Sequence, residues 1–451
     1  MPTRRDFFQL ALTALHAEYA NAQTGRPHFA PRAKSVIFLF MDGGVSHLDS
    51  FDPKPRVQKE SGQPLPIARP KLVRAVSTSL LASPFEFRPY GQSGAQVSSL
   101  FPEIAEHADD LCIVRSMVAD HSEHTAANYF MHSGSGLQGR PSMGAWITYG
   151  LGSPSRDLPG YVVLENGMTP PGGMDIFGSG FLPANFQASL FHAGPRAVAD
   201  ITPSDATPAK QRAKLDLLRD LDNAALPRYH ADRTMQAAIA NYELAYRMQA
   251  AVPELTDISG ESEATRTLYG LDDKDTEEYG RSCLLARRLV ERGVRFIELL
   301  SPKRDGLDRW DQHANLKRGH TVNAKATDKP IAALLKDLKA RGLLDEALLV
   351  WGGEFGRSPT TQGSGESAGR DHHPYGFTMW LAGAGVKPGV TYGATDEYGY
   401  YAIENRVHVH DLHATLLHLL GLDHTRLTYP FSGRDMRLTD VHGNVVRPIL
   451  S

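Results

Sequence analysis

Cysteine is scarce in this chain, and the spacing of the cysteines matches no disulfide or metal-binding motif. Only Cys112 and Cys283 occur among 451 residues, and both lie in apolar surroundings, which favours buried free thiols over a disulfide. No Cys-x-x-Cys pair and no Cys/His zinc spacing is present. The two cysteines therefore point neither to a disulfide framework nor to a zinc cluster.

The chain also lacks an excess of charge of one sign and any long apolar run. It has 48 Lys and Arg against 51 Asp and Glu, a formal net charge of -3. Such a balance argues against a nucleic-acid groove or a polybasic membrane patch. No apolar run approaches the roughly 20 residues that a membrane-spanning helix needs. With 41% hydrophobic residues, the composition is that of a chain with a large core. We expect neither a nucleic-acid partner nor an integral membrane segment.

The amino terminus has the pattern of an export signal. Residues 3–8 (TRRDFF) resemble a twin-arginine motif, a short apolar stretch follows, and Ala20-Asn21-Ala22 fits a small-residue cleavage site. A chance arginine pair on an amphipathic helix is the alternative. We interpret residues 1–30 as a signal peptide and linker, which predicts a periplasmic or extracellular protein. Residues 31–451 are expected to form a single domain with a helical insertion at about 200–280.

Apolar runs alternate with amphipathic helical patterns along the chain. Residues 35–41 (SVIFLFM) and 347–351 (ALLVW) are apolar runs typical of strands buried on both faces, and residues 294–300 are expected to form a further strand. Helical patterns at 279–292 and 328–341 lie between such runs. This alternation predicts an α/β fold with a mainly parallel central sheet and helices on both faces.

Acidic residues and a histidine follow the expected strands. Asp42 follows the strand expected at 35–41 and precedes two glycines. Asp311 and His313 come after the strand at 294–300, and Glu354 comes after the strand at 347–351. Asp42 alone would be interpreted as a turn former. Together these residues lie at the carboxyl ends of strands, where open α/β sheets build their sites. Asp311 and His313 can converge on one metal if the chain is extended there.

A loop rich in glycine, serine and threonine carries further candidates. It begins near Glu354 and Arg357 and ends in Arg370, Asp371, His372 and His373. Carboxylate and imidazole ligands beside guanidinium groups are what metal-assisted attack on an anionic ester requires. Two adjacent histidines alone would more often be satisfied surface residues. The matching groups at other strand ends favour a metal site.

Several longer stretches resemble one bacterial protein family. LFMDGGVSHLDSFDPKP, CLLARRLVERGVRF, WDQH, GGEFGRSP and GRDHHPYGFTMWLAGAGVKPG are similar to segments of a large uncharacterised family with twin-arginine leaders. This domain of unknown function is a branch of the alkaline phosphatase and sulfatase superfamily, and the resemblance spans residues 34–451. It implies an alkaline phosphatase-like three-layer sandwich with a site, usually for two metals, at the carboxyl ends of the strands.

The resemblance also implies roles for individual residues. The metal ligands would come from six residues: Asp42, Asp311, His313, Glu354, His372 and His373. Two positions depart from the superfamily pattern. Phe355 stands where a histidine ligand is usual, and phenylalanine cannot bind a metal. His124 stands at the start of an expected helix, where the superfamily has a Ser or Thr nucleophile.

The function implied is an exported metal-dependent hydrolase of a phosphate ester, or of a related sulfate or other anionic ester. The ligand types suit Zn or Mn, as one or two ions. Metal-activated water or His124 would be the nucleophile. Arg357 and Arg370 would clamp the non-bridging oxygens of a small phosphorylated or sulfated substrate. The Cys-x-Pro-x-Arg motif is absent, so no formylglycine sulfatase is expected.

A non-catalytic alternative stands beside this hypothesis. Phe355 and His124, at positions where the superfamily uses other residues, fit a metal-stabilised envelope protein that binds a ligand on the same fold, because one fold hosts many functions. For His408, His410 and His413, at the start of a helix, we expect capping, packing or a surface role in preference to metal binding. The sequence leaves open the substrate, the number of metals, the role of His124 and the oligomeric state.

Overall fold

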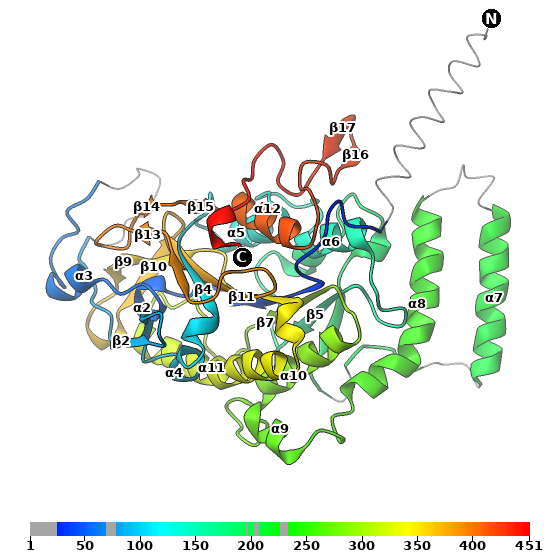
Figure 1. The fold of residues 1–451 in the computed structure, drawn as a ribbon, viewed down its shortest axis with the longest axis horizontal. Helices are drawn as coiled ribbons and strands as arrows, with labels where there is room; N and C mark the ends of the chain where they lie inside the picture. Colours follow the sequence, from blue (N-terminus) through cyan, green and yellow to red (C-terminus); the bar gives the residue numbers. More distant parts are fainter. Residues whose placement is uncertain (1–24, 69–77, 195–196, 203–206, 226–232) are drawn as a thin grey trace, which may run out of the picture.

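A computed structural model of the protein describes residues 25–68, 78–194, 197–202, 207–225 and 233–451. The expected signal peptide lies almost entirely outside these residues. Within them, a nine-stranded sheet has the order β12-β4-β11-β8-β1-β7-β5-β6, with β15 paired to β4 (Figure 1). Its strands are β1 (Ser35–Phe40), β4 (Leu111–Val118), β5 (Tyr161–Glu165), β6 (Ser189–His192), β7 (Phe296–Leu300), β8 (Ala347–Gly352), β11 (Phe377–Gly383), β12 (Val390–Tyr392) and β15 (Val407–His408).

Strand β11 is the one strand of this sheet that runs against the others. It pairs antiparallel with β4 and with β8, whereas every other pairing in the sheet is parallel. The amino end of β11 therefore lies at the same edge as the carboxyl ends of its neighbours. This places the residues just before β11 beside the loops that leave β4 and β8.

Alternate residues of β1 enter two separate cores. Ile37 and Leu39 belong to one core, and Val36, Phe38 and Phe40 belong to the other. Because successive strand residues point to opposite faces, a strand covered on both sides must be apolar throughout. All six residues of β1 are buried. The continuous run SVIFLF is explained by helices on both faces of the sheet.

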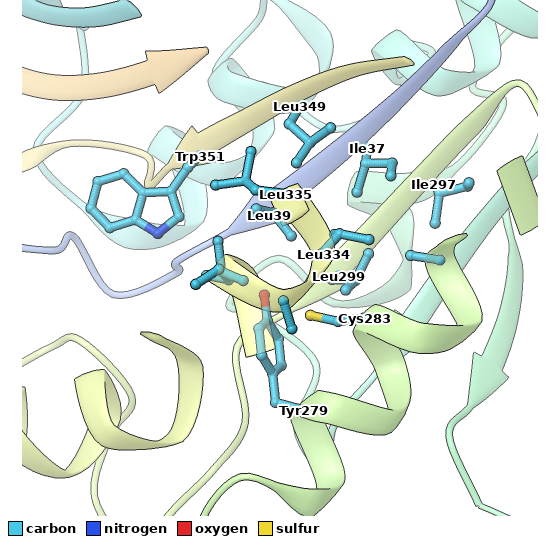
Figure 2. Packing of buried hydrophobic residues seen from close by; sticks show 14 of the residues in the cluster. Ile37, Leu39, Tyr279, Cys283, Ile297, Leu299, Leu334, Leu335, Leu349 and Trp351 are labelled. Carbon is cyan, nitrogen blue, oxygen red and sulfur yellow. The ribbon is translucent and has the colours of Figure 1, made fainter. Parts of the chain in front are cut away.

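Helices on opposite faces supply the rest of the two cores. On one face, Tyr279 and Cys283 of α10 (Glu277–Glu291) and Leu334 and Leu335 of α11 (Leu316–Ala340) pack against β1, β7 and β8 (Figure 2). The other core includes residues of α5 (His124–Ser133), α6 (Met143–Leu151) and α12 (Val409–Leu419). The fold is thus an α/β sandwich of helices, sheet and helices, as expected. Both cysteines are buried and free, also as expected.

The remaining α-helices and strands surround the sheet. The helices are α2 (His47–Ser50), α3 (Pro55–Lys59), α4 (Pro102–Ala105), α7 (Pro208–Ala225), α8 (Arg233–Thr256) and α9 (Glu263–Leu268). The strands are the hairpins β2 (Phe87–Tyr90) with β3 (Ala95–Ser98), β9 (Gly356–Gln362) with β10 (Gly369–His373), β13 (Ala394–Thr395) with β14 (Ala402–Glu404), and β16 (Tyr429–Phe431) with β17 (Arg434–Met436). Helices α7 and α8 stand side by side at one end of the molecule (Figure 1). No helix in the described ranges is long and apolar enough to cross a membrane.

Candidate metal centre

Four side chains from separate parts of the chain converge at the carboxyl edge of the sheet. They are His124 at the start of α5, Asp311 and His313 in the loop after β7, and His372 in β10. One ligand atom from each lies within 4.8 Å of the others. All four are half-buried, so the group is reachable from solvent. We call these four residues the metal-ligand group.

Local structure explains why these side chains arrive together. After β4, the carboxylate of Glu123 accepts hydrogen bonds from the backbone N–H groups of Thr125 and Ala126, which starts α5 at His124. The hairpin β9–β10 joins β8 to β11, so His372 sits just before the antiparallel strand. The reversed direction of β11 is what returns this histidine to the carboxyl edge.

The spacing of three ligand atoms matches a metal's coordination shell. The Oδ1 atom of Asp311 lies 3.0 Å from Nε2 of His313 and 3.2 Å from Nε2 of His372. The two Nε2 atoms are 2.9 Å apart. Ligands at the usual zinc distances of about 2.0–2.1 Å in a tetrahedral shell are separated by about 3.3 Å. The observed triangle is within a few tenths of an ångström of that arrangement.

Hydrogen bonds on the far side of each ring fix which nitrogen faces the centre. The Nδ1 atom of His313 lies 2.5 Å from Oε1 of Gln362, and Nδ1 of His372 lies 2.7 Å from the carbonyl oxygen of Ser122. Both partners accept, so each Nδ1 carries the proton and each Nε2 presents a lone pair to the centre. Two lone pairs 2.9 Å apart beside a carboxylate repel each other unless a cation lies between them. The residues therefore fit a divalent metal ion.

His124 faces the same centre from the other side. Its Nδ1 lies 2.6 Å from Oε1 of Glu354, and its Nε2 lies 3.2 Å from Oδ2 of Asp311. Burial lowers the pKa of His124, but the hydrogen bonds and charges of Asp311 and Glu354 outweigh it and raise the pKa to about 9. Without a metal, His124 is held as an imidazolium between two carboxylates. Its Nε2 is the nitrogen that faces the group.

Burial disfavours the charged form of Asp311, but its partners outweigh that effect. The imidazolium of His124 and the charge of Arg357 hold the pKa of Asp311 well below its ordinary value. The carboxylate is therefore ionised over the whole physiological range. An ionised carboxylate beside the Nε2 lone pairs of His313 and His372 is a ligand set for a cation.

Asp42 and Glu354, two predicted ligands, are not among the four residues of the metal-ligand group, although Glu354 contacts His124. Glu354 is fully buried and also accepts the backbone N–H of Gly43, at 3.0 Å to Oε1 and 3.2 Å to Oε2. Asp42 is ion-paired with the buried Arg309 and accepts the hydroxyl of Ser301 at 3.2 Å. Burial raises the pKa of Asp42, against the opposing charge of Arg309. Both carboxylates are therefore engaged in hydrogen bonds or ion pairs with other residues of the protein.

The guanidinium of Arg357 binds the protein and not a substrate. It is fully buried. Nε donates to the carbonyl of Gly44 at 2.9 Å, Nη1 donates to the carbonyl of Arg370 at 3.1 Å, and Nη2 donates to the carbonyl of Gly43 and to Oδ1 of Asp311. The Nη2–Oδ1 distance is 2.5 Å. Arg357 therefore positions Asp311, and the expectation of a clamp on the substrate does not fit its surroundings.

Arg370 and His373 face away from the metal-ligand group. Arg370 is paired with Asp49, with Nε 2.8 Å from Oδ2, and both residues are fully buried. It also donates to the carbonyl oxygens of Leu81 and Ser358. Because neighbours in a strand alternate, His373 points to the opposite side of β10 from His372. Its Nε2 donates to the carbonyl of Tyr400, and burial lowers its pKa to about 3. The expected clamp and ligand roles do not fit these positions.

Phe355 forms an apolar wall against the centre. Its ring centroid lies 5.0 Å from that of His124 and 4.7 Å from that of His372, and the residue is fully buried. Arg309, which pairs with Asp42, was not identified from the sequence, because a single arginine ahead of WDQH carries no spacing signal. His408 and His413 stay outside the group: one caps α12 and the other binds the carbonyl of Met131.

The sequence of this chain matches a family model over nearly its whole length. Residues 33–450 match the family described as "Protein of unknown function (DUF1501)". The chain belongs to this family. No curated protein matches this DUF1501 member.

Several solved structures are similar to the DUF1501 chain at low identity. The lipoteichoic acid synthase LtaP from Listeria monocytogenes is 10% identical with a TM-score of 0.32, covering 93% of this chain and 79% of that one. The PsFucS1 sulfatase from Pseudoalteromonas sp. is 13% identical with a TM-score of 0.36, covering 97% and 78%. Alkaline phosphatase from the Antarctic bacterium TAB5 is 11% identical with a TM-score of 0.36, covering 87% and 99%. The α/β fold has alkaline phosphatases and sulfatases among its structural neighbours.

Proposed function

We propose that this DUF1501 protein is an exported metal-dependent hydrolase of a phosphate ester or a related anionic ester. The main support for this proposal is the short distances among three atoms, Asp311 Oδ1, His313 Nε2 and His372 Nε2, which lie 2.9 to 3.2 Å from one another. Each histidine has its Nδ1 proton committed to an acceptor behind it. Export is supported by the residues at 3–8 of the sequence, and by nothing within the described ranges.

One metal ion is the number that the surroundings support. Asp42 is neutralised by Arg309, Glu354 is bonded to His124 and Gly43, and Phe355 offers no ligand atom. These residues therefore do not complete a second ligand set. Asp311, His313 and His372 would hold the ion, and mixed carboxylate and imidazole ligands suit Zn or Mn. Held by these residues, a divalent ion would lower the pKa of bound water from about 15.7 to near 7 and would polarise an ester oxygen.

His124 is the side chain placed to handle the proton or to attack. Glu354 accepts the Nδ1 proton of His124 at 2.6 Å and orients the ring. Nε2 is then the nitrogen left to take a proton from the attacking water or to bond phosphorus itself. A buried carboxylate behind a histidine is the arrangement that fixes the tautomer in other hydrolases.

Metal content is the first measurement. Mass spectrometry on the full-length exported protein should find one equivalent of Zn or Mn per chain. We expect His313→Ala and His372→Ala to lose that equivalent, since each removes a ligand. His442→Ala, an exposed histidine outside the group, should retain it. A parent protein without transition metal, or variants that keep it while folded, would overturn the proposal.

Activity is the second measurement. The metal-loaded protein should hydrolyse a nitrophenyl phosphate monoester or diester, and His124→Ala should lower kcat by about 10²-fold or more while keeping fold and metal. A variant that turns over as fast as the parent would remove His124 from the mechanism.

A non-catalytic metal-binding role is the second candidate. It is favoured by Arg357 and Arg370, both of which are engaged inside the protein and leave the expected clamp unfilled. A protein that holds one metal equivalent and binds inorganic phosphate, but cleaves neither ester, would establish this role instead.

A further inference from the structure

A glutamate lies in the middle of a strand that is otherwise apolar. Glu298 is the third residue of β7, whose sequence is FIELL, and all five residues are buried. Phe296 and Leu300, which point to the same face of the sheet as Glu298, belong to the apolar core on that face. Burying a carboxylate is costly unless it is paired and hydrogen-bonded. The charge of Glu298 must therefore be balanced by its neighbours.

Two side chains satisfy the carboxylate of Glu298. Nε2 of His132, in the last turn of α5, donates to Oε1 at 2.6 Å, and the hydroxyl of Tyr161, on β5, donates to Oε2 at 2.9 Å. Glu298 and His132 are fully buried, and Tyr161 is almost so. We call Glu298, His132 and Tyr161 the β7 anchor.

Both nitrogens of the His132 ring donate hydrogen bonds. Nδ1 donates to the carbonyl oxygen of Asn128 at 2.7 Å. Burial lowers the pKa of His132, but the charge and the hydrogen bond of Glu298 outweigh it and raise the pKa above its ordinary value. The rings of Phe40 and Phe177 pack edge-on against the imidazolium, with centroids 4.7 and 5.5 Å away. His132 is therefore held in one orientation.

Helix α5 has a second histidine–carboxylate pair at its other end. His124, the first residue of the helix, donates through Nδ1 to Oε1 of Glu354 at 2.6 Å. Glu354 follows β8 and Glu298 lies on β7, and these two strands flank β1 in the sheet. The two histidines are eight residues apart, which is about 12 Å along the helix axis. Bonds to the sheet at both ends of a rigid helix fix its position along the axis and its rotation about it.

We propose that Glu298 and His132 are positioning residues that place His124 at the metal centre. Phe130 and Met131 of α5 also pack in the apolar core, but apolar contacts have no direction. The hydrogen bonds of the β7 anchor supply that direction. A helix shifted by about 1 Å would misplace His124, and a misplacement of that size can cost about 10²-fold in rate. The inference rests on the proposed role of His124 in catalysis, but the position of its ring can be measured without any activity.

Apolar replacement of the β7 anchor separates positioning from stability. Replacing a buried charged pair with apolar residues of similar volume is often neutral or stabilising. The triple variant His132→Leu, Tyr161→Phe and Glu298→Met removes all the side-chain hydrogen bonds of the anchor. We expect its free energy of unfolding in urea to be no lower than that of the parent, and its metal content to be the same. Its kcat for a nitrophenyl phosphate should fall at least tenfold with KM unchanged, because the metal ligands stay in place and only His124 moves.

Glu298→Gln is the conservative variant. Glutamine has the length of glutamate, its amide oxygen can accept the proton of His132, and its NH2 group can donate to the hydroxyl oxygen of Tyr161. This variant should keep the kcat of the parent. Glu298→Met, which has a similar size but neither acceptor nor donor in its place, should not.

Nuclear magnetic resonance follows the position of His124 directly. In the metal-free, full-length protein labelled with 15N-histidine, the Nδ1–H signal of His124 is identified by its loss in His124→Ala. The short bond to Glu354 should place this signal far downfield, and the triple variant should shift it upfield as the bond lengthens. Tyr161→Phe removes one oxygen atom, should fold, and should shift the signal the same way by less. Tyr269→Phe removes a matched buried hydroxyl, bonded to Asp337 at 3.0 Å, and should not shift it.

Three results would overturn the proposal. They are a His124 signal that Tyr161→Phe leaves unchanged, an equal shift in Tyr269→Phe, and a fall in kcat of the triple variant that is matched by loss of stability or of metal. A parent protein that hydrolyses no ester would refute the proposed function alone. The His124 signal would still decide whether Glu298 and His132 position the ring.

Discussion

At the scale of single residues, Arg357 and Asp49 show how buried charged side chains can shape a metal site without binding the metal. Arg357 holds the carboxylate of Asp311 and two glycine carbonyl oxygens, and Asp49 holds Arg370. Such partners set the direction in which a ligand atom points. They are as consequential for a metal as the ligands themselves.

Arg357→Lys should weaken metal binding and leave the fold intact. A lysine keeps the charge but cannot bond Asp311 and the glycine carbonyl oxygens in one plane, so the carboxylate loses its orientation. We expect a 10- to 100-fold rise in the dissociation constant for zinc, measured by chelator competition. Arg318→Lys, at an exposed position, should not change it. If Arg357 clamped the substrate, KM for a phosphate ester would rise while metal affinity stayed constant.

The residues of the metal-ligand group were largely visible in the sequence, and their surroundings were not. Asp311, His313 and His372 were candidates because polar residues near the ends of apolar strands mark the carboxyl edge of a sheet, and His124 was a candidate through the family resemblance. Which of two adjacent histidines faces the centre depends on the pleat of β10, and hydropathy does not record it. The pairing of Arg370 with Asp49 joins residues 321 positions apart, which no local pattern signals.

At the scale of elements, the hairpin β9–β10 is the part that delivers a ligand. Its strands pair antiparallel, with His372 opposite Arg357. The start of β10 also lies against the loop that carries the other ligands: a Cβ atom at Gly369 would be 2.2 Å from the carbonyl carbon of His313. Only a residue without a side chain lets these two segments approach so closely.

Gly369→Ala should therefore disturb the metal site through the backbone. The added methyl group forces the loop of His313 away from β10, and we expect metal affinity to fall at least tenfold with no ligand removed. Isothermal titration with zinc on the metal-free protein measures it. Gly260→Ala is the matched control, because nothing lies within 4 Å of the added methyl group there. Equal affinities for the two variants would contradict this reading of the hairpin.

The sequence predicted strands more accurately than helix ends. The run 35–41 is β1 at Ser35–Phe40, and the run 347–351 is β8 at Ala347–Gly352. The helix predicted at 328–341 instead begins at Leu316, with Pro330 inside it. A proline suggests a helix start because it lacks an N–H group, but burial of α11 against the sheet outweighs that local cost. Hydropathy could not predict that β11 is antiparallel either, because an apolar run does not indicate the direction in which a strand runs in the sheet.

At the scale of the whole molecule, four buried histidines with lowered pKa values contribute to the loss of stability in acid. Burial lowers the pKa to about 3 for His320, His373 and His413, and to about 4 for His410. The ordinary pKa of a histidine, as in an unfolded chain, is about 6.5. Below that pH these histidines bind protons in the unfolded state but stay neutral in the folded state. The free energy of unfolding therefore falls as the pH falls from about 6.5 towards 4.

Urea unfolding at pH 7 and pH 5, with metal removed by a chelator, should show this loss. Each such histidine contributes up to about 1.4 kcal/mol per pH unit below its unfolded pKa. His320→Gln keeps an acceptor for the backbone N–H of Ser46, which the ring now accepts at 3.2 Å, and removes one titrating group. We expect this variant to lose less stability between the two pH values than the parent. An identical pH dependence would show that His320 is protonated in the folded state.

The antiparallel strand β11 has a consequence for the order of events in folding. The metal-ligand group joins residues 124, 311 and 372, and these meet only when β4, β7, β8 and β11 all lie in one sheet. Contacts so distant along the chain form late, after the cost of closing long loops has been met. An ion at this centre thus binds a nearly finished protein. It would slow unfolding while leaving the folding rate almost unchanged.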